Sequence, residues 1–428
     1  MSMEEDAGAE MMSLAKKLWP LDRSLSGDGV RDTLGIIQKE IPALQVLGIS
    51  SGEKVFDWTV PEEWAVSEAY ILDPSGQRIC DFKTNNLHLV GYSAPFEGVL
   101  GLEELQGHLH SLPAQPDAIP YVTSYYKRTW GFCLSQKARD SLKPGPYRVV
   151  IRTKLFSGEL NYGELVIKGK SSREIFLSTY ICHPSMANNE LSGPVLATRI
   201  ADTLMHRDNY YSYRLVFLPE TIGALIYMSR NLKQLQRRML AGFVLTCVGD
   251  EGFFSYLPSR NQNTVADRAA LSVLQNRGER FIHYSWLDRG SDERQYCSPG
   301  ADLPVCSVMR TKYGEYPEYH TSLDTLGGVV TERGLQKSFE TYLTIIDQLE
   351  GQRFPRALQV GEPQLGKRNL WPSLSMKGVY SSFRPLADAI SLMDGQTETA
   401  EIAGILNLTP GEMCEIVTRL EDEGLVEQ

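Results

Sequence analysis

Four residues of types that bind metal ions or move protons stand beside short apolar runs of the chain. These runs are rich in β-branched residues and are bounded by Gly and Pro, a pattern typical of buried strands in an α/β sheet. Functional groups in such sheets gather at the carboxyl ends of the strands. The pattern therefore indicates a metal-dependent hydrolase, and its candidate residues are His183, Glu220, Asp250 and His320.

A hydrolytic zinc site needs imidazole and carboxylate ligands, an open position for water, and a carboxylate that takes the proton of that water. His183, Asp250 and His320 supply the ligand types, and Glu220 supplies the base. Each of these residues alone is weak evidence, because a lone His or Glu at a strand end is more often a hydrogen-bonded structural group. The chain has only 7 histidines, however, and two of them fall in the most polar segments of the α/β region.

Composition limits the class of protein. The 428 residues include no low-complexity tract, so the chain can bury a substantial core and divides into two or three domains. Its 7 cysteines are dispersed without a Cys-x-x-Cys, which favours a reducing, cytoplasmic location. No apolar run reaches the roughly 20 residues that span a bilayer. A net charge of -10 argues against a polyanionic partner.

The periodicity of the chain predicts three units. Strands and helices alternate over 147–349, which indicates an α/β layered core, and two helices within 13–41 are expected to pack on it. Short runs and crowded aromatic residues indicate a β-rich domain inserted into that core. The expected limits are 1–50 and 143–355 for the core, 51–142 for the inserted lid and 365–428 for a C-terminal domain.

The C-terminal segment reads as three short helices over 386–393, 399–406 and 411–423, followed by Gly424, Leu425 and Val426. This order is that of a winged helix-turn-helix. The third helix carries acidic residues against Arg419 alone, whereas contacts to phosphates need clustered Lys or Arg. We therefore expect no nucleic acid and no membrane as partner, and expect this domain to contact a protein or a second copy of the chain.

Several motifs, in order along the chain, resemble the bacterial aminopeptidase-like proteins of the zinc-exopeptidase superfamily. Members of that family carry an inserted lid and a winged-helix tail, and they often occur with polysaccharide-biosynthesis genes. The matching segments are Leu21-Asp22-Arg23-Ser24, Phe56-Asp57-Trp58-Thr59-Val60-Pro61, Cys182-His183-Pro184-Ser185, Pro219-Glu220-Thr221-Ile222-Gly223, Gly249-Asp250 and Tyr319-His320-Thr321-Ser322.

The resemblance implies a phosphorylase/hydrolase-like α/β core, with His183 and Asp250 at one metal position and His320 at the other. Glu220 aligns with the general base of the wider zinc-aminopeptidase pattern, and Thr221 stands where that pattern has a second, metal-binding Glu.

Asn189 stands where family members usually have the Asp that bridges two metal ions. An amide is neutral and offers one carbonyl oxygen, so it cannot replace an anionic bridge between two zinc ions. We therefore expect one zinc ion at the site, with Asn189 as a weaker ligand. Glu190 is the adjacent carboxylate that could substitute for the missing Asp.

A charged segment further along the chain is the candidate substrate-binding region. Asp292, Glu293 and Arg294 lie in a loop-like stretch that the family also carries, and they could recognise a substrate amine or carboxylate. A solvated charge run is an equally good interpretation. Arg310 and Tyr313 have the same status.

The sequence leaves two functions open. In the first, a metal-bound water deprotonated by Glu220 attacks the carbonyl of a peptide or of a small amide substrate. In the second, the chain keeps the fold and cleft but binds a ligand or partner without hydrolysis. The retained polar groups at strand ends favour the hydrolase, and Asn189 favours the binder. A regulator acting through the winged helix is disfavoured by the acidic tail.

Overall fold

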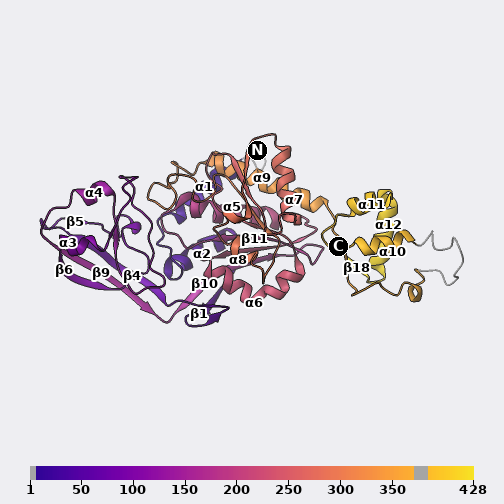
Figure 1. Ribbon diagram of the computed structural model, residues 1–428, viewed down its shortest axis with the longest axis horizontal. Coiled ribbons are helices and arrows are strands. Elements are labelled where there is room, and N and C mark those ends of the chain that lie inside the picture. Colours follow the sequence, from indigo (N-terminus) through magenta and orange to yellow (C-terminus); the bar gives the residue numbers. More distant parts are fainter. Residues whose placement is uncertain (1–5, 371–383) are drawn as a thin grey trace.

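The computed structural model describes residues 6–370 and 384–428 (Figure 1). Its central element is an eight-stranded sheet in the order β1-β10-β12-β11-β13-β16-β14-β15. The strands β12, β11, β13 and β16 run parallel to one another, and antiparallel strands flank them. The bounds are β1 Gln45–Ser50, β10 Glu159–Ile167, β11 Glu174–Tyr180, β12 Ser212–Leu218, β13 Met239–Val244, β14 Phe254–Leu257, β15 Phe281–His283 and β16 Val305–Met309.

Helices cover both faces of this sheet, because its parallel strands are apolar on both sides. Alternate residues of β11 enter opposite cores: Ile175 and Leu177 pack with the helices of one face, and Phe176 packs with those of the other. The first face carries α1 (Ala7–Leu18), α2 (Asp28–Glu40), α5 (Ser192–Met205), α7 (Val265–Asn276) and α9 (Glu332–Gly351). The second carries α6 (Ile222–Arg238) and α8 (Glu293–Tyr296). The predicted α/β layered fold is confirmed.

A four-stranded antiparallel sheet, in the order β5-β4-β9-β6, forms the lid domain at one end of the core (Figure 1). The prediction for one strand is wrong. The segment 147–153 was assigned to the core, but its strand β9 pairs with β4 and β6 of the lid sheet. A hydrophobic run identifies a strand without identifying its partner. The bounds are β4 Glu63–Leu72, β5 Arg78–Ile79, β6 Phe96–Gly101 and β9 Pro146–Phe156.

The tail lies at the opposite end of the core from the lid (Figure 1). Its helices are α10 (Arg384–Leu392), α11 (Thr399–Leu406) and α12 (Pro410–Asp422), and a short strand β18 (Val426–Glu427) pairs with β17 (Arg356–Ala357). The buried guanidinium of Arg173 fixes the tail to the core by donating to the carbonyls of Phe354 and Gly395. Among the described residues, no helix is long and apolar enough to cross a bilayer.

Candidate functional site

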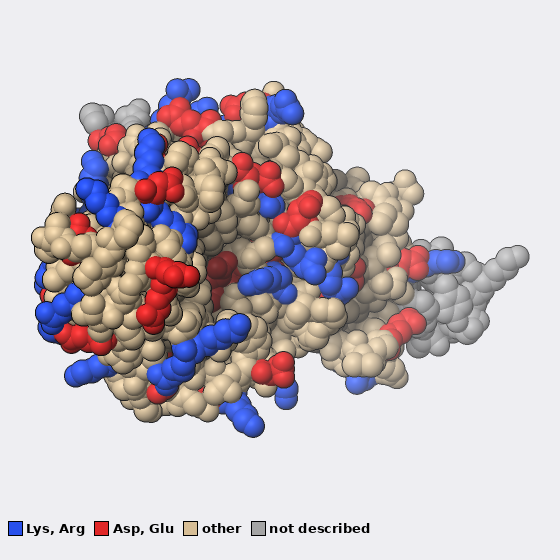
Figure 2. Space-filling model, turned by 60° about the vertical axis from the view of Figure 1, so that its left-hand side comes forward, with Lys and Arg blue, Asp and Glu red and all other residues tan. Residues whose placement is uncertain are grey.

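The four parallel strands bring the candidate residues to one edge of the sheet. His183 follows β11, Glu220 follows β12, Asp250 follows β13 and Arg310 follows β16. Figure 2 shows a hollow between the lid and the core, with acidic side chains on its floor and basic side chains on its rim. The topology therefore brings these residues to the same end of the sheet.

His183 is held by a buried ion pair behind it. Its Nδ1 lies 3.2 Å from Glu190 Oε2, and its backbone N–H donates to the same oxygen. Arg23 Nε donates to Glu190 Oε1 at 2.7 Å, and neither side chain of this pair is exposed. Arg23 also donates to the carbonyls of His183 and Leu18. The imidazole is therefore fixed in orientation, with Nε2 as the nitrogen available to the cleft.

Glu220 lies beside that nitrogen. Its Oε2 is 3.6 Å from His183 Nε2, and its Oε1 accepts a hydrogen bond from Ser291 Oγ at 3.0 Å. The side chain keeps 22% of its surface exposed, so water in the cleft reaches the carboxylate. A carboxylate that meets both water and an imidazole has the contacts of a general base.

Burial and charge tune both groups. Burial raises the pKa of Glu220, although the positive charge of His183 opposes the rise. Burial lowers the pKa of His183, but Cys182, Glu190 and Glu220 together raise it well above its usual range. Burial also raises the pKa of the Cys182 thiol to about 11, so this neighbour is uncharged near neutral pH. Near neutral pH Cys182 therefore contributes no negative charge, and the carboxylates of Glu190 and Glu220 beside the ring are what favours a protonated His183.

Asn189 belongs to a second, uncharged part of the site. It lies in a one-turn π-helix, η2 (Ala187–Leu191), and its own φ and ψ angles are outside the helical range. Its Oδ1 accepts from the Tyr180 hydroxyl, which also bonds Thr246, and its Nδ2 lies 3.0 Å from His320 Nε2. Single π-helical turns of this kind occur often at functional sites.

His320 is neutral in this arrangement. Burial and the nearby His183 lower its pKa to about 3, which leaves Nε2 free to accept from the Asn189 amide. The ring stacks on Tyr319 at 3.9 Å. Tyr121 of the lid lies 5.2 Å from both imidazole rings, and its backbone N–H donates to the His320 carbonyl.

Asp250 does not join the other candidate ligands. Its Oδ1 accepts from Gly252 N at 2.7 Å and Thr311 Oγ1 at 2.8 Å. Its Oδ2 accepts from Asn188 Nδ2 at 2.9 Å and Thr311 N at 3.0 Å. Two oxygens offer about four lone-pair positions, so this carboxylate is fully engaged. Asp250 ties the loop after β13 to the loop after β16.

The donor set does not fit a paired zinc centre. Among the described residues, one group of His, Cys, Asp and Glu side chains brings three ligand atoms within 4.8 Å of one another, and it is Cys182, His183 and Glu190. Glu190 is already engaged by Arg23 and by the backbone N–H of His183, and Cys182 Sγ lies 3.5 Å from His183 Nδ1. Zinc prefers thiolate, neutral imidazole and free carboxylate. This group therefore does not supply the free donors that a zinc ion needs.

Backbone strain accompanies the candidate residues. Four non-glycine residues near them have positive φ: Ser185 at 47°, Thr221 at 65°, Cys247 at 51° and His320 at 54°. Such conformations cost of order 1 to 3 kcal/mol each and cluster at functional sites. Each of the four loops at this sheet edge contains one of them, which supports a functional role for the edge.

Three of the expected substrate-binding residues have structural contacts. Glu293 Oε1 accepts from the backbone N–H groups of Gly290 and Ser291 and from the Tyr313 hydroxyl, so Glu293 and Tyr313 brace the loop before α8. Arg310 is buried, with its guanidinium 4.2 Å above the Phe254 ring and its Nε donating to the Asp250 carbonyl.

Asp292 and Arg294 contact the residue that follows the base. Asp292 is fully buried and accepts from the backbone N–H of Thr221 at 2.7 Å. Arg294 is exposed, and its Nη2 donates to Thr221 Oγ1 at 2.7 Å. Both therefore lie one residue from Glu220.

Three residues of the site escaped the sequence reasoning. Tyr121 comes from the lid, Tyr180 ends β11, and Ser291 lies in the loop before α8. Tyr180 alone had a signal, because it is a polar aromatic residue in the strand that leads to His183. Tyr121 and Ser291 reach the site through tertiary packing, which no local pattern reports.

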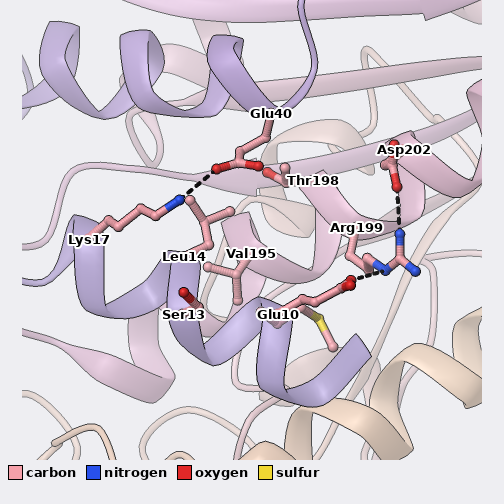
Figure 3. Close-up of a pocket in the computed structure, with 10 residues that line it drawn as sticks. Glu10, Ser13, Leu14, Lys17, Glu40, Val195, Thr198, Arg199 and Asp202 are labelled. Carbon is pink, nitrogen blue, oxygen red and sulfur yellow. Dashed lines mark hydrogen bonds and ion pairs between the residues drawn. The ribbon is translucent and has the colours of Figure 1, made fainter. Parts of the chain in front are cut away.

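A pocket of about 430 Å³ lies away from this site, between α1 and α5 (Figure 3). Its charged side chains pair with one another: Lys17 with Glu40, and Arg199 with Glu10 and Asp202. None of the candidate residues lines it. We therefore assign the site to the sheet edge.

The sheet with functional groups at the carboxyl ends of its strands, the inserted lid and the winged-helix tail define an aminopeptidase-like protein, as a 42% identical relative is also described. The chain belongs to the family described as a domain of unknown function, DUF4910, whose model matches residues 12–352. Residues 353–428 match a winged helix-turn-helix model. The predicted family and fold are confirmed, whereas the predicted domain limits stay predictions.

Relatives of known sequence or structure agree with this class. A Clostridium acetobutylicum protein described as "Putative polysaccharide biosynthesis protein with aminopeptidase-like domain" is 42% identical over 401 residues, which cover 93% of this chain and 91% of that protein. A "putative peptidase" structure from the same species has TM-score 0.80 and 40% identity, with 98% and 96% of the two chains covered. The Bacillus subtilis zinc aminopeptidase BSAP has TM-score 0.60 and 11% identity, with 81% and 95% covered, which shows a shared fold alone.

Proposed function

We propose that the protein is a peptidase-like hydrolase that cleaves a peptide or amide bond in the cleft, with Glu220 as general base. The contact between Glu220 and His183, 3.6 Å apart and backed by the buried Arg23 and Glu190 pair, is the observation that supports this most. A raised carboxyl pKa brings a base closer to neutral pH, where proton transfer is most effective.

In this reaction Glu220 takes a proton from water, and the water oxygen attacks the carbonyl carbon. The protonated His183 stabilises the negative charge that forms on the carbonyl oxygen. The C–N bond then breaks, and Glu220 returns the proton to the leaving amine. The products are a carboxylic acid and an amine, so no other reactant is needed.

The proposed reaction does not use zinc, and whether the protein binds zinc is a question for measurement. Two of the expected ligands, His183 and His320, lie close together, with their ring centroids 5.3 Å apart. Asp250 is fully engaged and Asn189 is neutral. Any zinc bound here is therefore a single ion with few protein ligands, and the acid-base step above does not depend on it.

A second candidate function is binding without hydrolysis. The observation that favours it is the hydrogen-bonded set of Tyr180, Asn189 and His320, which is uncharged and fills the region where the family pattern places a bridging carboxylate. A neutral, satisfied set of this kind can line a recognition pocket without assisting any bond cleavage.

The two candidates separate in one variant. We expect wild-type protein to release p-nitroaniline from aminoacyl p-nitroanilides, and Glu220→Gln to lose at least about a hundredfold of that rate, because removal of a general base typically costs that much. Glu315→Gln is the matched control, since Glu315 is exposed. Equal rates in wild type and Glu220→Gln would rule out the base. Binding of these compounds without release of p-nitroaniline would favour the second function.

We also propose that the winged helix contacts a protein. Helix α12 exposes Glu412, Glu415 and Glu421, which would repel a phosphate backbone. Fluorescence anisotropy with duplex DNA at low salt tests this, and salt-dependent binding of the DNA would overturn it.

A further inference from the structure

Arg294 is a basic residue of the cleft that the proposed reaction does not use. It lies in α8 and is exposed, and its Nη2 donates to Thr221 Oγ1 at 2.7 Å. Thr221 directly follows Glu220 and holds φ at 65°. The guanidinium is therefore anchored one residue from the proposed base.

Most of the hydrogen-bonding capacity of this guanidinium is unused. An Arg side chain has five N–H donors. Within the described ranges, Arg294 makes one side-chain hydrogen bond and no ion pair. The remaining donors belong to an exposed side chain at the cleft and are available to a ligand.

The nearby carboxylates do not pair with Arg294, because other groups already orient them. Glu220 accepts from Ser291 Oγ, and Asp292 accepts from the backbone N–H of Thr221. Glu293 accepts from two backbone N–H groups and the Tyr313 hydroxyl. Arg294 thus carries a positive charge whose partner is not supplied by its own segment.

The charge of Arg294 affects the pKa of residues in three segments around the cleft. Burial raises the pKa of Glu220, of Tyr126 in the lid and of Tyr319 beside His320, and Arg294 opposes that rise in all three. Tyr126 is 74% exposed, so this lid residue near Arg294 is open to solvent. A negatively charged group that enters between lid and core therefore meets an unpaired cation next to the base.

We propose that Arg294 binds a carboxylate of the substrate, so that the site selects peptides or amides with a carboxylate close to the bond that is cut. The planar guanidinium fork matches the two oxygens of a carboxylate, and such pairs are among the strongest hydrogen-bonded contacts in proteins. The cut bond rests on the proposed function, but the carboxylate contact itself needs no turnover. An acidic side chain and a free C-terminus both supply this group.

Two pairs of probes separate these sources. L-glutamyl and L-glutaminyl p-nitroanilide differ only in a side-chain carboxylate, and Leu-Gly and Leu-Gly amide differ only in a C-terminal carboxylate. We expect the charged member of one pair to be favoured by about tenfold to a hundredfold, the usual worth of a charge-assisted hydrogen bond. The favoured pair identifies the source.

The variants are Arg294→Gln, which removes the charge, and Arg294→Lys, which keeps the charge without the fork. Arg294→Gln should bring the preference close to one, and Arg294→Lys should retain part of it. Arg289→Gln is the matched control, because Arg289 is exposed on the same segment and lies over the Trp286 ring. That control should keep the full preference.

Turnover and binding are both measured, as kcat/KM for wild type and as Kd by titration calorimetry in the Glu220→Gln background. A preference in Kd that depends on Arg294, without turnover in wild type, supports the carboxylate contact and contradicts the proposed hydrolysis. Equal affinity within both pairs, a preference that survives Arg294→Gln, or no binding of any of the four compounds overturns the assignment of Arg294.

Discussion

The two halves of the candidate site have the same position at the sheet edge but differ in charge. In the first half, His183 and Glu220 meet in front of the buried pair of Arg23 and Glu190. In the second, Tyr180, Asn189 and a neutral His320 bond one another. Buried charge is costly to maintain, and neutral hydrogen-bonded groups cost less. The difference indicates that proton transfer belongs to the first half and recognition to the second.

Removing Arg23 should have the largest effect on this contrast. Arg23→Ala leaves Glu190 buried without its partner, and we expect the free energy of unfolding to fall by about 3 to 5 kcal/mol in urea titrations. Lys17→Ala is the control, because Lys17 and Glu40 form an exposed pair worth at most about 1 kcal/mol. Equal losses of unfolding free energy in the two variants would mean that the buried pair of Arg23 and Glu190 stabilises the protein no more than an exposed ion pair does.

Asn189→Asp should convert the second half from neutral to charged. The new carboxylate cannot donate to His320, so we expect a loss of about 1 to 3 kcal/mol without added metal. The negative charge also raises the pKa of His320 from about 3. Added zinc should raise the Tm of this variant by binding the folded state, and leave that of wild type nearly unchanged. The same zinc response in both proteins would contradict the contrast.

The pH dependence of kcat/KM tests the first half. Glu220 must be deprotonated to act as a base, and its pKa is raised by burial above the ordinary 4.5. The rate should therefore fall as the pH drops through a value above 4.5. Ser291→Ala removes a hydrogen bond that lowers this pKa, so the acid limb should move up by at most about one pH unit. If the acid limb of the pH profile does not move in Ser291→Ala, then Ser291 does not influence the pKa of Glu220.

A further expected effect is on the pH dependence of stability near Asp22, which precedes Arg23. Burial raises the pKa of Asp22 from 3.8 to about 7, although Arg23 lowers it. The folded protein then holds a proton that the unfolded chain releases, so this contribution to stability is present below about pH 4 and is lost as the pH rises through about 7. Asp22→Asn should flatten the pH dependence of the urea midpoint over that range. An unchanged slope would show that Asp22 does not titrate with folding.

The sequence predicted elements and strand ends well, because their signals are local. Helix α11 begins and ends at the predicted residues. The apolar runs before His183 and Glu220 also placed both residues correctly at the carboxyl ends of strands. The pattern could not show that β9 pairs in the lid sheet, since pairing depends on residues far along the chain.

The chemistry of the site was less accessible, because it depends on tertiary contacts. Thr311 and Asn188 engage Asp250 from separate loops, and Tyr121 reaches the two imidazoles from the lid. No spacing along the chain reports such contacts. The sequence showed that position 189 is Asn and not Asp. The structure shows that this amide contacts Tyr180 and His320.

The most direct test of the account measures p-nitroaniline release from aminoacyl p-nitroanilides by wild type and Glu220→Gln, each with and without a metal chelator. We predict that wild type is active in both conditions and that Glu220→Gln is inactive in both. Loss of wild-type activity in chelator, together with retained activity in Glu220→Gln, would contradict it and move the chemistry to a metal ion.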